Sequence, residues 1–463
     1  MIDFARLIAA DSGQNATPIT CLTADQLDDW ITQQPDTVRS FVRAAGFAAK
    51  PHEYVLVPEG KGDALRVVAG VTDSDTLAVW SLAKLAEVLP EGHYRLDDDL
   101  TPGRAVIGWC LAQHKFNRYL SNGDDKGPRV LLTDKLPNAE ACMAEAGATA
   151  LVRDMVNTPA EDMGPAMLEK LAEKAADAYG AKLIVTRGDA LEQGYPMIHA
   201  VGRASSRAHA PRLIELEWGK EDHPRLAIVG KGVCFDSGGL DIKSAVGMRL
   251  MKKDMGGAAH ALALAHLVMG AKLPVRLHLL IPAVENGIAA GAFRPGDILT
   301  SRKGDSVEIG NTDAEGRLVL GDALTKAGED DPELVIDFAT LTGAARIALG
   351  PDLPAMFCDS EDVASGLHDA GRDVGDPMWR LPLWDDYADM LKTPVADINN
   401  SGGAFAGSIT AALFLKRFAP ANGDWVHFDT FAWRPTARPG QSQGGEALGL
   451  RASWRYLQQR FRQ

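Results

Sequence analysis

The sequence contains little cysteine and no cysteine pattern that binds a structural zinc ion. Its 463 residues include five scattered cysteines: Cys21, Cys110, Cys142, Cys234 and Cys358. None of them has a CxxC or zinc-finger spacing, and their odd number argues against a framework of disulfides. Cys234 is interpreted as a small buried residue rather than as a nucleophile or metal ligand.

Long apolar runs and an excess of basic residues are also missing. No apolar run reaches the ~18 residues that a membrane-spanning helix needs. The first residues, Met1 to Arg6, include an acid and lack the long apolar core of a secretory signal. The formal net charge of −14 argues against general binding to nucleic acids or anionic membranes. We therefore expect a cytoplasmic protein with neither a membrane nor a nucleic acid as partner.

Two common hydrolase motifs are absent as well. The chain has no Gly-x-Ser-x-Gly turn for a serine nucleophile and no His-Glu-x-x-His helix for a single zinc ion. What is present is the composition of a globular enzyme, 46% hydrophobic and 24% charged. A chain of 463 residues is long enough for two domains.

The larger part of the chain alternates apolar strands with helices. We expect strands at 182–186, 212–218, 226–229, 275–281 and 334–338, and helices at 256–272, 317–326 and 408–418. This alternation predicts an α/β fold with a mixed, mostly parallel sheet that helices cover on both faces. Functional sites in such folds gather at the carboxyl ends of the strands.

The first 136 residues predict a small N-terminal α/β accessory domain. Strands are expected at 53–58, 65–69 and 130–133, and helices at 77–89 and 105–120. Trp109, His114, Phe116 and Tyr119 have helical spacing and are interpreted as a packing face. Residues 137–463 are expected to form a connecting helix, which Pro159 ends, and the larger catalytic domain.

The residues that carry chemistry are concentrated between positions 231 and 317. They are Lys231, Asp236, Lys243, Asp254, Asp313, Glu315 and Arg317. An Asp-x-Glu beside glycine is usually a solvated turn, so the prediction depends on all seven residues together. Acidic side chains this close repel one another unless a positive group lies among them. Divalent cations bound by carboxylate oxygens supply that charge, and a pair of cations suits hydrolysis.

Three segments of this region are similar to the metal-binding motifs of the leucyl aminopeptidase family, the dinuclear cytosol aminopeptidases of M17 type. They are Val-Gly-Lys-Gly-Val-Cys-Phe-Asp-Ser-Gly-Gly at 229–239, Lys-Asp-Met-Gly-Gly-Ala-Ala at 253–259 and Asn-Thr-Asp-Ala-Glu-Gly-Arg-Leu at 311–318. The resemblance covers about residues 150–463 and is looser before them. It implies a metal-dependent aminopeptidase that hydrolyses the N-terminal bond of peptides, with a preference for neutral or apolar first residues such as leucine.

The resemblance also implies a role for each candidate residue. Lys231, Asp236, Asp254, Asp313 and Glu315 would bind two divalent ions, manganese or zinc, although magnesium and cobalt suit such ligands too. Lys231 would bind as a neutral amine, which burial and a nearby dication favour; the alternative is a charge-balancing neighbour of the carboxylates. Lys243 would stabilise the oxyanion. Arg317 would hold a bicarbonate ion that takes a proton from the attacking water.

The substrate pocket and the assembly are likewise expected by resemblance. The substrate-binding residues would be Met251, Asn311, Thr340, Leu341 and Gly343, and the chain would form a homohexamer. One departure from the family is the pair Lys252 and Lys253, which changes the charge at the rim of the site. His260 and His266 lie on the expected helix 256–272 and are interpreted as buried or capping residues.

Two other functions stay open at this point. One is another dinuclear metallohydrolase, for example one that acts on phosphate esters; the lack of histidine in the three motifs counts against it. The other is a protein that keeps the fold but serves in regulation or DNA binding, and the presence of all seven motif residues counts against that. The residues determine neither the native metal nor the order of substrates.

Overall fold

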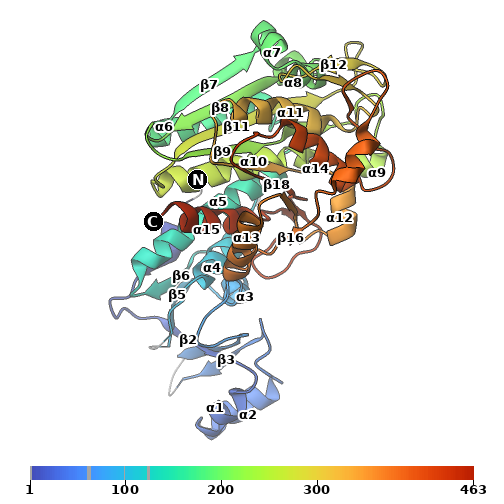
Figure 1. Ribbon diagram of the computed structural model, residues 1–463. Helices are drawn as coiled ribbons and strands as arrows, with labels where there is room; N and C mark the ends of the chain where they lie inside the picture. Colours follow the sequence, from blue (N-terminus) through green and yellow to red (C-terminus); the bar gives the residue numbers. More distant parts are fainter. Residues whose placement is uncertain (1–2, 60–63, 98–99, 122–125, 463) are drawn as a thin grey trace. The chain divides into compact units, whose positions relative to one another are not determined.

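The computed structural model describes residues 3–59, 64–97, 100–121 and 126–462, and they form two compact units (Figure 1). Unit 1 comprises residues 1–150 and 436–443, and unit 2 comprises residues 151–435 and 444–463. The division falls within one helix, α5 (Leu136–Asn157). The domain boundary expected at residue 136 lies at the start of this helix and stays a prediction.

Unit 1 is built on a sheet whose strands are mostly parallel. In the described residues its order is β1-β6-β5-β2-β4-β3, and β3 alone runs antiparallel to its neighbour. The strands are β1 (Ile8–Ala10), β2 (Thr17–Leu22), β3 (Tyr54–Pro58), β4 (Leu65–Gly70), β5 (Gly92–Leu96) and β6 (Arg129–Thr133). The helices are η1 (Ala5–Leu7), α1 (Leu27–Thr32), α2 (Asp36–Ala44), α3 (Ala83–Val88) and α4 (Ala105–Gln113).

Two helices of unit 1 are shorter than the sequence predicts. The expected helix 77–89 is α3, and the expected helix 105–120 ends at Gln113 in α4. Trp109 is fully buried, and its indole N–H donates to the carbonyl of Arg129 at 2.9 Å. Tyr119 lies beyond the helix and is half exposed. The predicted packing face was therefore wrong past Gln113, because the apolar run that forms α4 stops before that residue.

Unit 2 contains the larger sheet. In the described residues its order is β16-β15-β18-β14-β9-β11-β8-β7, with β10 paired to β11. The strands are β7 (Lys182–Arg187), β8 (Arg212–Trp218), β9 (Arg225–Gly230), β10 (Gly232–Asp236), β11 (Arg276–Asn286), β14 (Leu334–Ala339), β15 (Ala355–Cys358), β16 (Trp379–Arg380) and β18 (Asp424–Asp429). The pairs β7–β8, β8–β11 and β15–β18 are antiparallel, and the others are parallel. The predicted mixed, mostly parallel sheet is confirmed.

Helices cover both faces of this sheet (Figure 1). One layer consists of α7 (Gly188–Gly194), α8 (Pro196–Gly202), α11 (Glu315–Gly328) and α14 (Gly407–Phe418), whose apolar residues form one core with Ala227 and Val229 of β9. The other layer consists of α6 (Pro165–Tyr179), α10 (Gly256–Gly270), α13 (Glu361–Val374) and α15 (Leu450–Phe461), which contact one another and the sheet. Side chains of a strand alternate between the two faces of the sheet, so each layer of helices packs against a different set of strand side chains.

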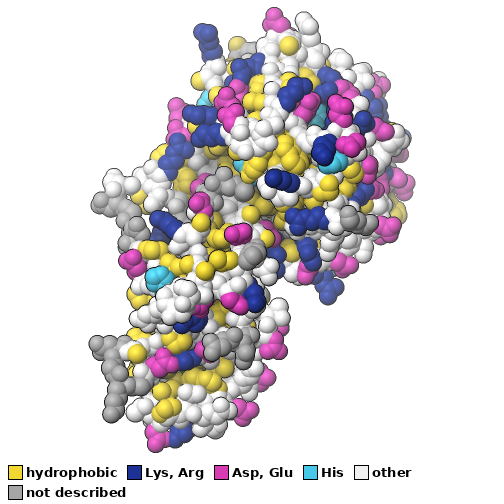
Figure 2. All heavy atoms as spheres, turned by 90° about the vertical axis from the view of Figure 1, so that its left-hand side faces the viewer, with side chains coloured by type: hydrophobic (Ala, Val, Ile, Leu, Met, Phe, Trp, Pro, Cys, Tyr) yellow, Lys and Arg dark blue, Asp and Glu magenta, His cyan; other side chains and the backbone are white. Residues whose placement is uncertain are grey.

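Shorter elements complete unit 2. They are η2 (Arg207–His209), α9 (Ala245–Met248), η3 (Met251–Met255), α12 (Gly343–Leu349), η4 (Asp385–Leu391), a small sheet of β12 (Ile298–Thr300), β13 (Ser306–Glu308) and β17 (Ile398–Asn399), and the pair β19 (Trp433–Arg434) and β20 (Gly444–Gly445). None of the helices in the described residues is long and apolar enough to cross a membrane. On the face shown in Figure 2, basic side chains are interspersed with acidic ones.

Three neighbouring parallel strands position the residues that the sequence analysis singles out. β9, β14 and β18 end at the same edge of the sheet, where Lys231, Thr340 and Thr430 follow them directly. The start of α10 approaches this edge closely because Gly257 has no side chain: a Cβ atom there would lie 2.1 Å from the carbonyl oxygen of Phe338. The sheet therefore brings loops that are distant in the sequence to one place, as expected for an α/β fold.

Candidate metal centre and active site

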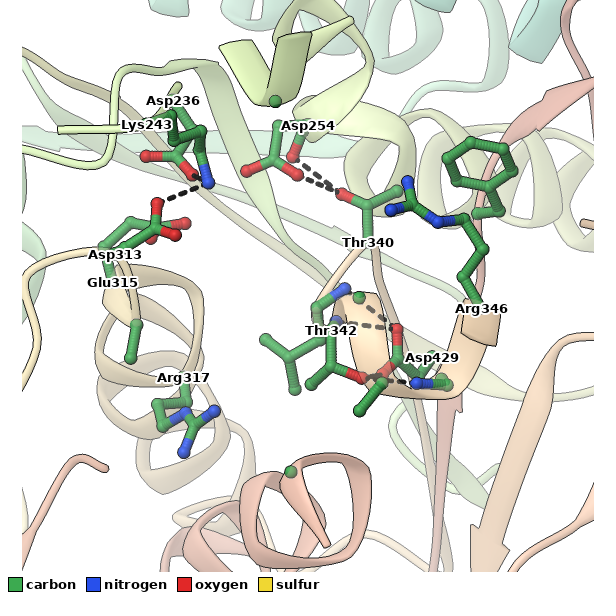
Figure 3. A pocket seen from close by; sticks show the side chains of 18 of the residues that line it. Asp236, Lys243, Asp254, Asp313, Glu315, Arg317, Thr340, Thr342, Arg346 and Asp429 are labelled. Atoms are coloured by element: carbon green, nitrogen blue, oxygen red, sulfur yellow. Dashed lines mark hydrogen bonds and ion pairs between the residues drawn. The ribbon is translucent and has the colours of Figure 1, made fainter. Parts of the chain in front are cut away.

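A cavity of about 760 Å³ opens at this edge of the unit 2 sheet. All twelve residues for which the sequence analysis gives a role at the site line it, and Figure 3 shows part of this lining. They are Lys231, Asp236, Lys243, Met251, Asp254, Asn311, Asp313, Glu315, Arg317, Thr340, Leu341 and Gly343. The structure thus brings together residues that are spread over more than a hundred positions of the sequence, although their individual roles remain proposals.

Each acidic side chain reaches the cavity from the end of an element. Asp236 is the last residue of β10, and Asp254 lies in η3, directly before α10. Glu315 is the first residue of α11, where a carboxylate also interacts favourably with the helix dipole. Asp313 precedes that helix by two residues, and its backbone N–H donates to the side chain of Asn311 at 2.8 Å.

Because Gly316 has no side chain, it leaves room for the side chain of Lys231 among the acidic residues. A Cβ atom at position 316 would lie 2.6 Å from Cε and 2.7 Å from Nζ of Lys231. These separations are far below van der Waals contact, so a larger residue at 316 would have to displace the lysine. The glycine that follows Glu315 in the motif is therefore a condition for placing Lys231 among the carboxylates.

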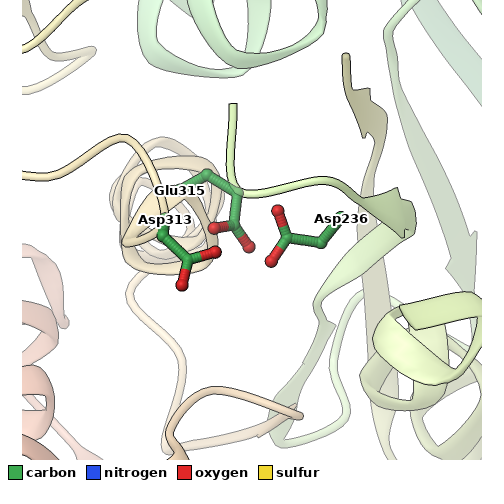
Figure 4. Close-up of side chains that lie close together, drawn as sticks. All are labelled: Asp236, Asp313 and Glu315. Atoms are coloured by element: carbon green, nitrogen blue, oxygen red, sulfur yellow. The ribbon is translucent and has the colours of Figure 1, made fainter. Parts of the chain in front are cut away.

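Three carboxylates converge at one point of the cavity. Oxygen atoms of Asp236, Asp313 and Glu315 all lie within 4.8 Å of one another (Figure 4). Asp236 and Glu315 are buried, and Oε2 of Glu315 has no hydrogen-bond partner in the part of the chain that the structure describes. Buried carboxylates without partners are costly unless a positive charge compensates them.

Two lysines divide the carboxylates between them. The ammonium of Lys231 lies 2.7 Å from Oδ2 of Asp254 and 2.9 Å from Oε1 of Glu315. The ammonium of Lys243 lies 2.7 Å from Oδ2 of Asp236 and also forms an ion pair with Asp313. Burial alone would lower the pKa of both lysines, but the surrounding carboxylates raise both values above the ordinary one.

The carboxylates differ in how well they are compensated. Burial, followed by repulsion from Asp236, raises the pKa of Glu315 to about 8, and the same two causes raise that of Asp313 to about 6. Burial would also raise the pKa of Asp254, but Lys231 and Lys253 hold it below its ordinary value. Of these carboxylates, Glu315 and Asp313 are therefore the two whose negative charge is least compensated by neighbouring groups.

Arg317 lies on the first turn of α11 and is buried. Its Nη1 donates to the carbonyl of Asn400 at 2.8 Å, whereas its Nε has no hydrogen-bond partner among the described residues. Burial lowers the pKa of the guanidinium to about 10, so the group remains a cation at neutral pH. A buried guanidinium with an unused N–H on the cavity is suited to binding a small anion.

The two histidines nearest the motifs lie away from the cavity. His260 is fully buried in α10; its Nδ1 lies 2.6 Å from the carbonyl of Gly256, and its Nε2 accepts the backbone N–H of Leu448. His266 contacts the hydroxyl of Tyr179, and burial lowers its pKa to about 4. No described residue that lines the cavity is a histidine. Their interpretation as buried or capping residues is confirmed.

The sequence analysis gives no role to two asparagines that organise the site. The amide of Asn286 donates to Oδ1 of Asp236 at 2.9 Å and to the carbonyl of Thr312 at 3.1 Å. Asn400 accepts the backbone N–H groups of Gly310 and Asn311, so it fixes the loop before α11. The available signal was an asparagine as the last residue of the apolar strand β11.

The donor set fits divalent cations. Of the five carboxylates that line the cavity, four belong to the three motifs; three of these four are close enough to share an ion, and one buried carboxylate oxygen lacks a partner. Carboxylate oxygens are the preferred ligands of hard cations and also bind manganese and zinc. Lys231 could add a nitrogen ligand, because its Nζ contacts both Asp254 and Glu315.

Comparison with known proteins identifies the family. Residues 150–453 match the model of the cytosol aminopeptidase family, catalytic domain, and residues 17–131 match the M17 aminopeptidase, N-terminal domain. A probable cytosol aminopeptidase from Syntrophotalea carbinolica is 42% identical over 363 residues, which cover 75% of this chain and 72% of that protein. A probable cytosol aminopeptidase from Gloeothece citriformis is 40% identical over 442 residues, 90% of this chain and 89% of that protein.

Solved structures agree with this result. The cytosol aminopeptidase from Coxiella burnetii has a TM-score of 0.93 and 45% identity and covers 99% of this chain and 100% of its own. The bottromycin maturation enzyme BotP, in complex with Mn, has a TM-score of 0.85 and 30% identity and covers 96% of this chain and 99% of its own. With both domains matched and the carboxylates of its motifs gathered in one cavity, the chain belongs to the cytosol aminopeptidase family, M17, and is a metal-dependent exopeptidase.

Proposed function

We propose that this aminopeptidase removes neutral, often bulky apolar residues such as leucine from the N-termini of peptides, with two divalent ions per subunit. The observation that carries the proposal is the gathering of four carboxylates, two lysines and an arginine around one cavity. Met251, Leu341 and Gly343 line the same cavity and supply apolar or small surface for the first side chain.

The five proposed metal ligands take different parts. Asp236 and Glu315 would contact both ions; Asp254 would serve the tighter site, and Asp313 the more exchangeable one through its side chain and its carbonyl. Lys231 would bind as a neutral amine once divalent ions replace its charge beside Asp254. Bound divalent ions lower the pKa of the attacking water and polarise the scissile carbonyl. Manganese or zinc is the proposed pair; BotP, 30% identical, has been solved with Mn, and magnesium and cobalt also suit the ligands.

Lys243 would act on the substrate rather than on the metal. Its side chain is 16% exposed, whereas that of Lys231 is 3% exposed, so Lys243 has access to a bound peptide. A fixed cation near the scissile carbonyl stabilises the negative charge that develops in the transition state. This role requires the ammonium to turn from Asp236 and Asp313 toward the carbonyl oxygen.

Arg317 would hold a bicarbonate ion. The unused N–H of its buried guanidinium and the absence of histidine among the described lining residues both support this proposal. Bicarbonate would accept a proton from the attacking water, the step for which many hydrolases use a histidine. Asn400, which accepts a hydrogen bond from Nη1, would keep the guanidinium oriented toward the cavity.

The proposal extends to the assembly and the location of the protein. We propose a homohexamer that acts in the cytosol; the curated relatives are called cytosol aminopeptidases. Light scattering on the purified chain tests the assembly directly. A mass of six subunits would support it, and a monomer at working concentration would contradict it.

The activity itself is tested with aminoacyl amides and dipeptides, Cys-Gly among them, in the presence of each metal in turn. Release of the first amino acid from leucinamide with manganese or zinc is the expected result. A blocked analogue, N-acetyl-leucinamide, serves as the control, because an exopeptidase that requires a free amino terminus leaves it intact. Cleavage of the blocked analogue at a similar rate would contradict the proposal.

A further inference from the structure

One wall of the cavity carries two basic side chains that the proposed hydrolysis does not use. Lys253 in η3 and Arg346 in α12 both line the cavity, together with the ring of Phe431. Nζ of Lys253 lies 5.8 Å from the centre of that ring, and Cζ of Arg346 lies 4.9 Å from it. The two cations therefore share one aromatic side chain.

Arg346 is a cation without a carboxylate partner. In the described residues it forms no ion pair, and its guanidinium lies over the Phe431 ring. Figure 3 shows the guanidinium extended toward Thr340 and the interior of the cavity. An arginine stays charged at every physiological pH, and its planar group binds a carboxylate through two parallel hydrogen bonds.

Lys253 adds to the positive charge of this wall. It is 5% exposed, and its ammonium lies 3.1 Å from Oδ1 of Asp254. The same carboxylate is bound by Lys231 through Oδ2 and by the hydroxyl of Thr340 through Oδ1. Lys231 also pairs with Glu315, so the two ammonium groups face two carboxylates, and Arg346 is the cation of this wall that no carboxylate of the described residues balances.

The position of this wall determines which part of a bound peptide can reach it. This inference rests on the proposed function. The scissile carbonyl faces Lys243, which lies at the end of the cavity with Asp236 and Asp313. Asp254 lies at the other end, toward Thr340 and Arg346 (Figure 3), and Lys253 pairs with Asp254. A peptide that places its amino group among the carboxylates and its carbonyl at Lys243 directs its first side chain toward this second end.

We propose that Arg346, assisted by Lys253, binds the side-chain carboxylate of an aspartate or glutamate at the first position of the substrate. The enzyme then releases acidic N-terminal residues as well as apolar ones. The Phe431 ring packs against the methylene groups of either kind of side chain, and the guanidinium supplies the partner that an acidic side chain needs when it leaves water.

The test compares kcat/KM for glutamyl and leucyl p-nitroanilides, which have no C-terminal carboxylate, in the wild type and in Arg346→Met. Because Arg346 is exposed, the variant should fold, and methionine keeps the length of the side chain. A hydrogen-bonded ion pair predicts that glutamyl hydrolysis falls about 10-fold to 100-fold while leucyl hydrolysis is nearly unchanged. Arg346→Lys should restore part of the loss.

Lys252→Met provides the matched control. Lys252 is the neighbour of Lys253, but it does not line the cavity; its ammonium donates to the carbonyl of Asn157 at 2.6 Å. The ratio of glutamyl to leucyl hydrolysis should be the same in this variant as in the wild type. A similar fall of the ratio in Lys252→Met would mean that general charge, and not the wall, selects the substrate, which would overturn the inference.

Three further results would overturn it. One is a wild type that hydrolyses the leucyl but not the glutamyl substrate; another is an Arg346→Met variant that loses both activities equally. A third is an Arg346→Met variant that loses hydrolysis of Leu-Gly but not of leucyl p-nitroanilide. This result would assign the wall to the C-terminal carboxylate of short peptides. Failure of the wild type on the leucyl substrate would contradict the proposed function, and this inference with it.

Discussion

Lys231 and Lys243 carry the same charge but contact different carboxylates. Lys231 is buried between Asp254 and Glu315, whereas Lys243 lies nearer the opening and pairs with Asp236 and Asp313. We propose that Lys231 binds metal and that Lys243 stabilises the developing oxyanion. The two assignments lead to different phenotypes.

The two alanine variants should separate metal content from turnover. Lys243→Ala should keep both ions, change KM little and lose about 10²–10³ in kcat, because it removes an interaction made mainly in the transition state. Lys231→Ala should bind less metal, and excess metal should restore part of its activity. Metal analysis beside kcat for both variants is the measurement. If Lys243→Ala loses metal while Lys231→Ala keeps it, the roles are reversed.

The start of α11 shows how an element can place a ligand. The helix begins at Glu315, and the next residue must be small because Lys231 crosses the helix there. Gly316→Ala should displace Lys231 from its carboxylates and destabilise the fold by about 1–3 kcal/mol, as overpacking in a filled interior does. Urea unfolding measures this loss.

Gly291→Ala is the control for this substitution. A Cβ atom at Gly291 meets nothing within 4 Å, and the residue has no positive φ, so the substitution should leave stability nearly unchanged. Equal stability of Gly316→Ala and the wild type would show that the crossing of Lys231 and α11 is looser than the structure implies.

A second pair of elements, β14 and β18, is joined by a buried ion pair. Asp337 and His427 face each other in the register, and Nδ1 of His427 lies 2.5 Å from Oδ1 of Asp337. Oδ2 of Asp337 accepts the indole N–H of Trp425 at 2.7 Å. Burial would lower the pKa of His427, but Asp337 and Asp429 outweigh it and raise the pKa above its ordinary value.

This pair predicts a pH-dependent contribution to stability. A histidine with a raised folded pKa stabilises fully below its unfolded pKa of about 6.5, and the contribution is lost as the pH rises through the folded value. The advantage of the wild type over Asp337→Asn should therefore be largest below about pH 6.5 and shrink above it. Urea unfolding of both proteins over this range measures it. An advantage that grows with pH would contradict the assignment.

Elements with a clear period were predictable, and those fixed by tertiary contact were not. The strands 212–218 and 334–338 follow from apolar runs and are close to β8 and β14. The predicted end of the helix at 105–120 was wrong, because the helical spacing of aromatic residues continues past Gln113 although the apolar run does not. The periodicity of a sequence predicts which face of an element is buried better than it predicts where the element ends.

In the whole molecule, the topology rule predicts where the site lies, and the resemblance to the aminopeptidase motifs predicts which residues form it. The loops after β9 and β14 meet in any parallel sheet, and this places Lys231 beside Thr340. Asn286, Asn400 and Arg346 could not be assigned in the same way. Their roles depend on hydrogen bonds and ring contacts between segments that no local pattern links.

The chain as a whole is acidic, but its site mixes both signs. A net charge of −14 says little about a cavity that five carboxylates line together with Lys231, Lys243, Lys253, Arg317 and Arg346. We propose that divalent ions complete this balance of charge and make the carboxylates catalytic. Without them Oε2 of Glu315 has no hydrogen-bond partner among the described residues, and Lys231 pairs only with Oε1.

Metal content measured together with leucinamide hydrolysis tests this claim most directly. Extended treatment with a strong chelator, followed by metal analysis, should remove the ions and abolish hydrolysis. Titration with Mn²⁺ or Zn²⁺ should then restore the rate in proportion to occupancy, up to two ions per subunit. Full activity in a sample verified to be free of metal would contradict the account.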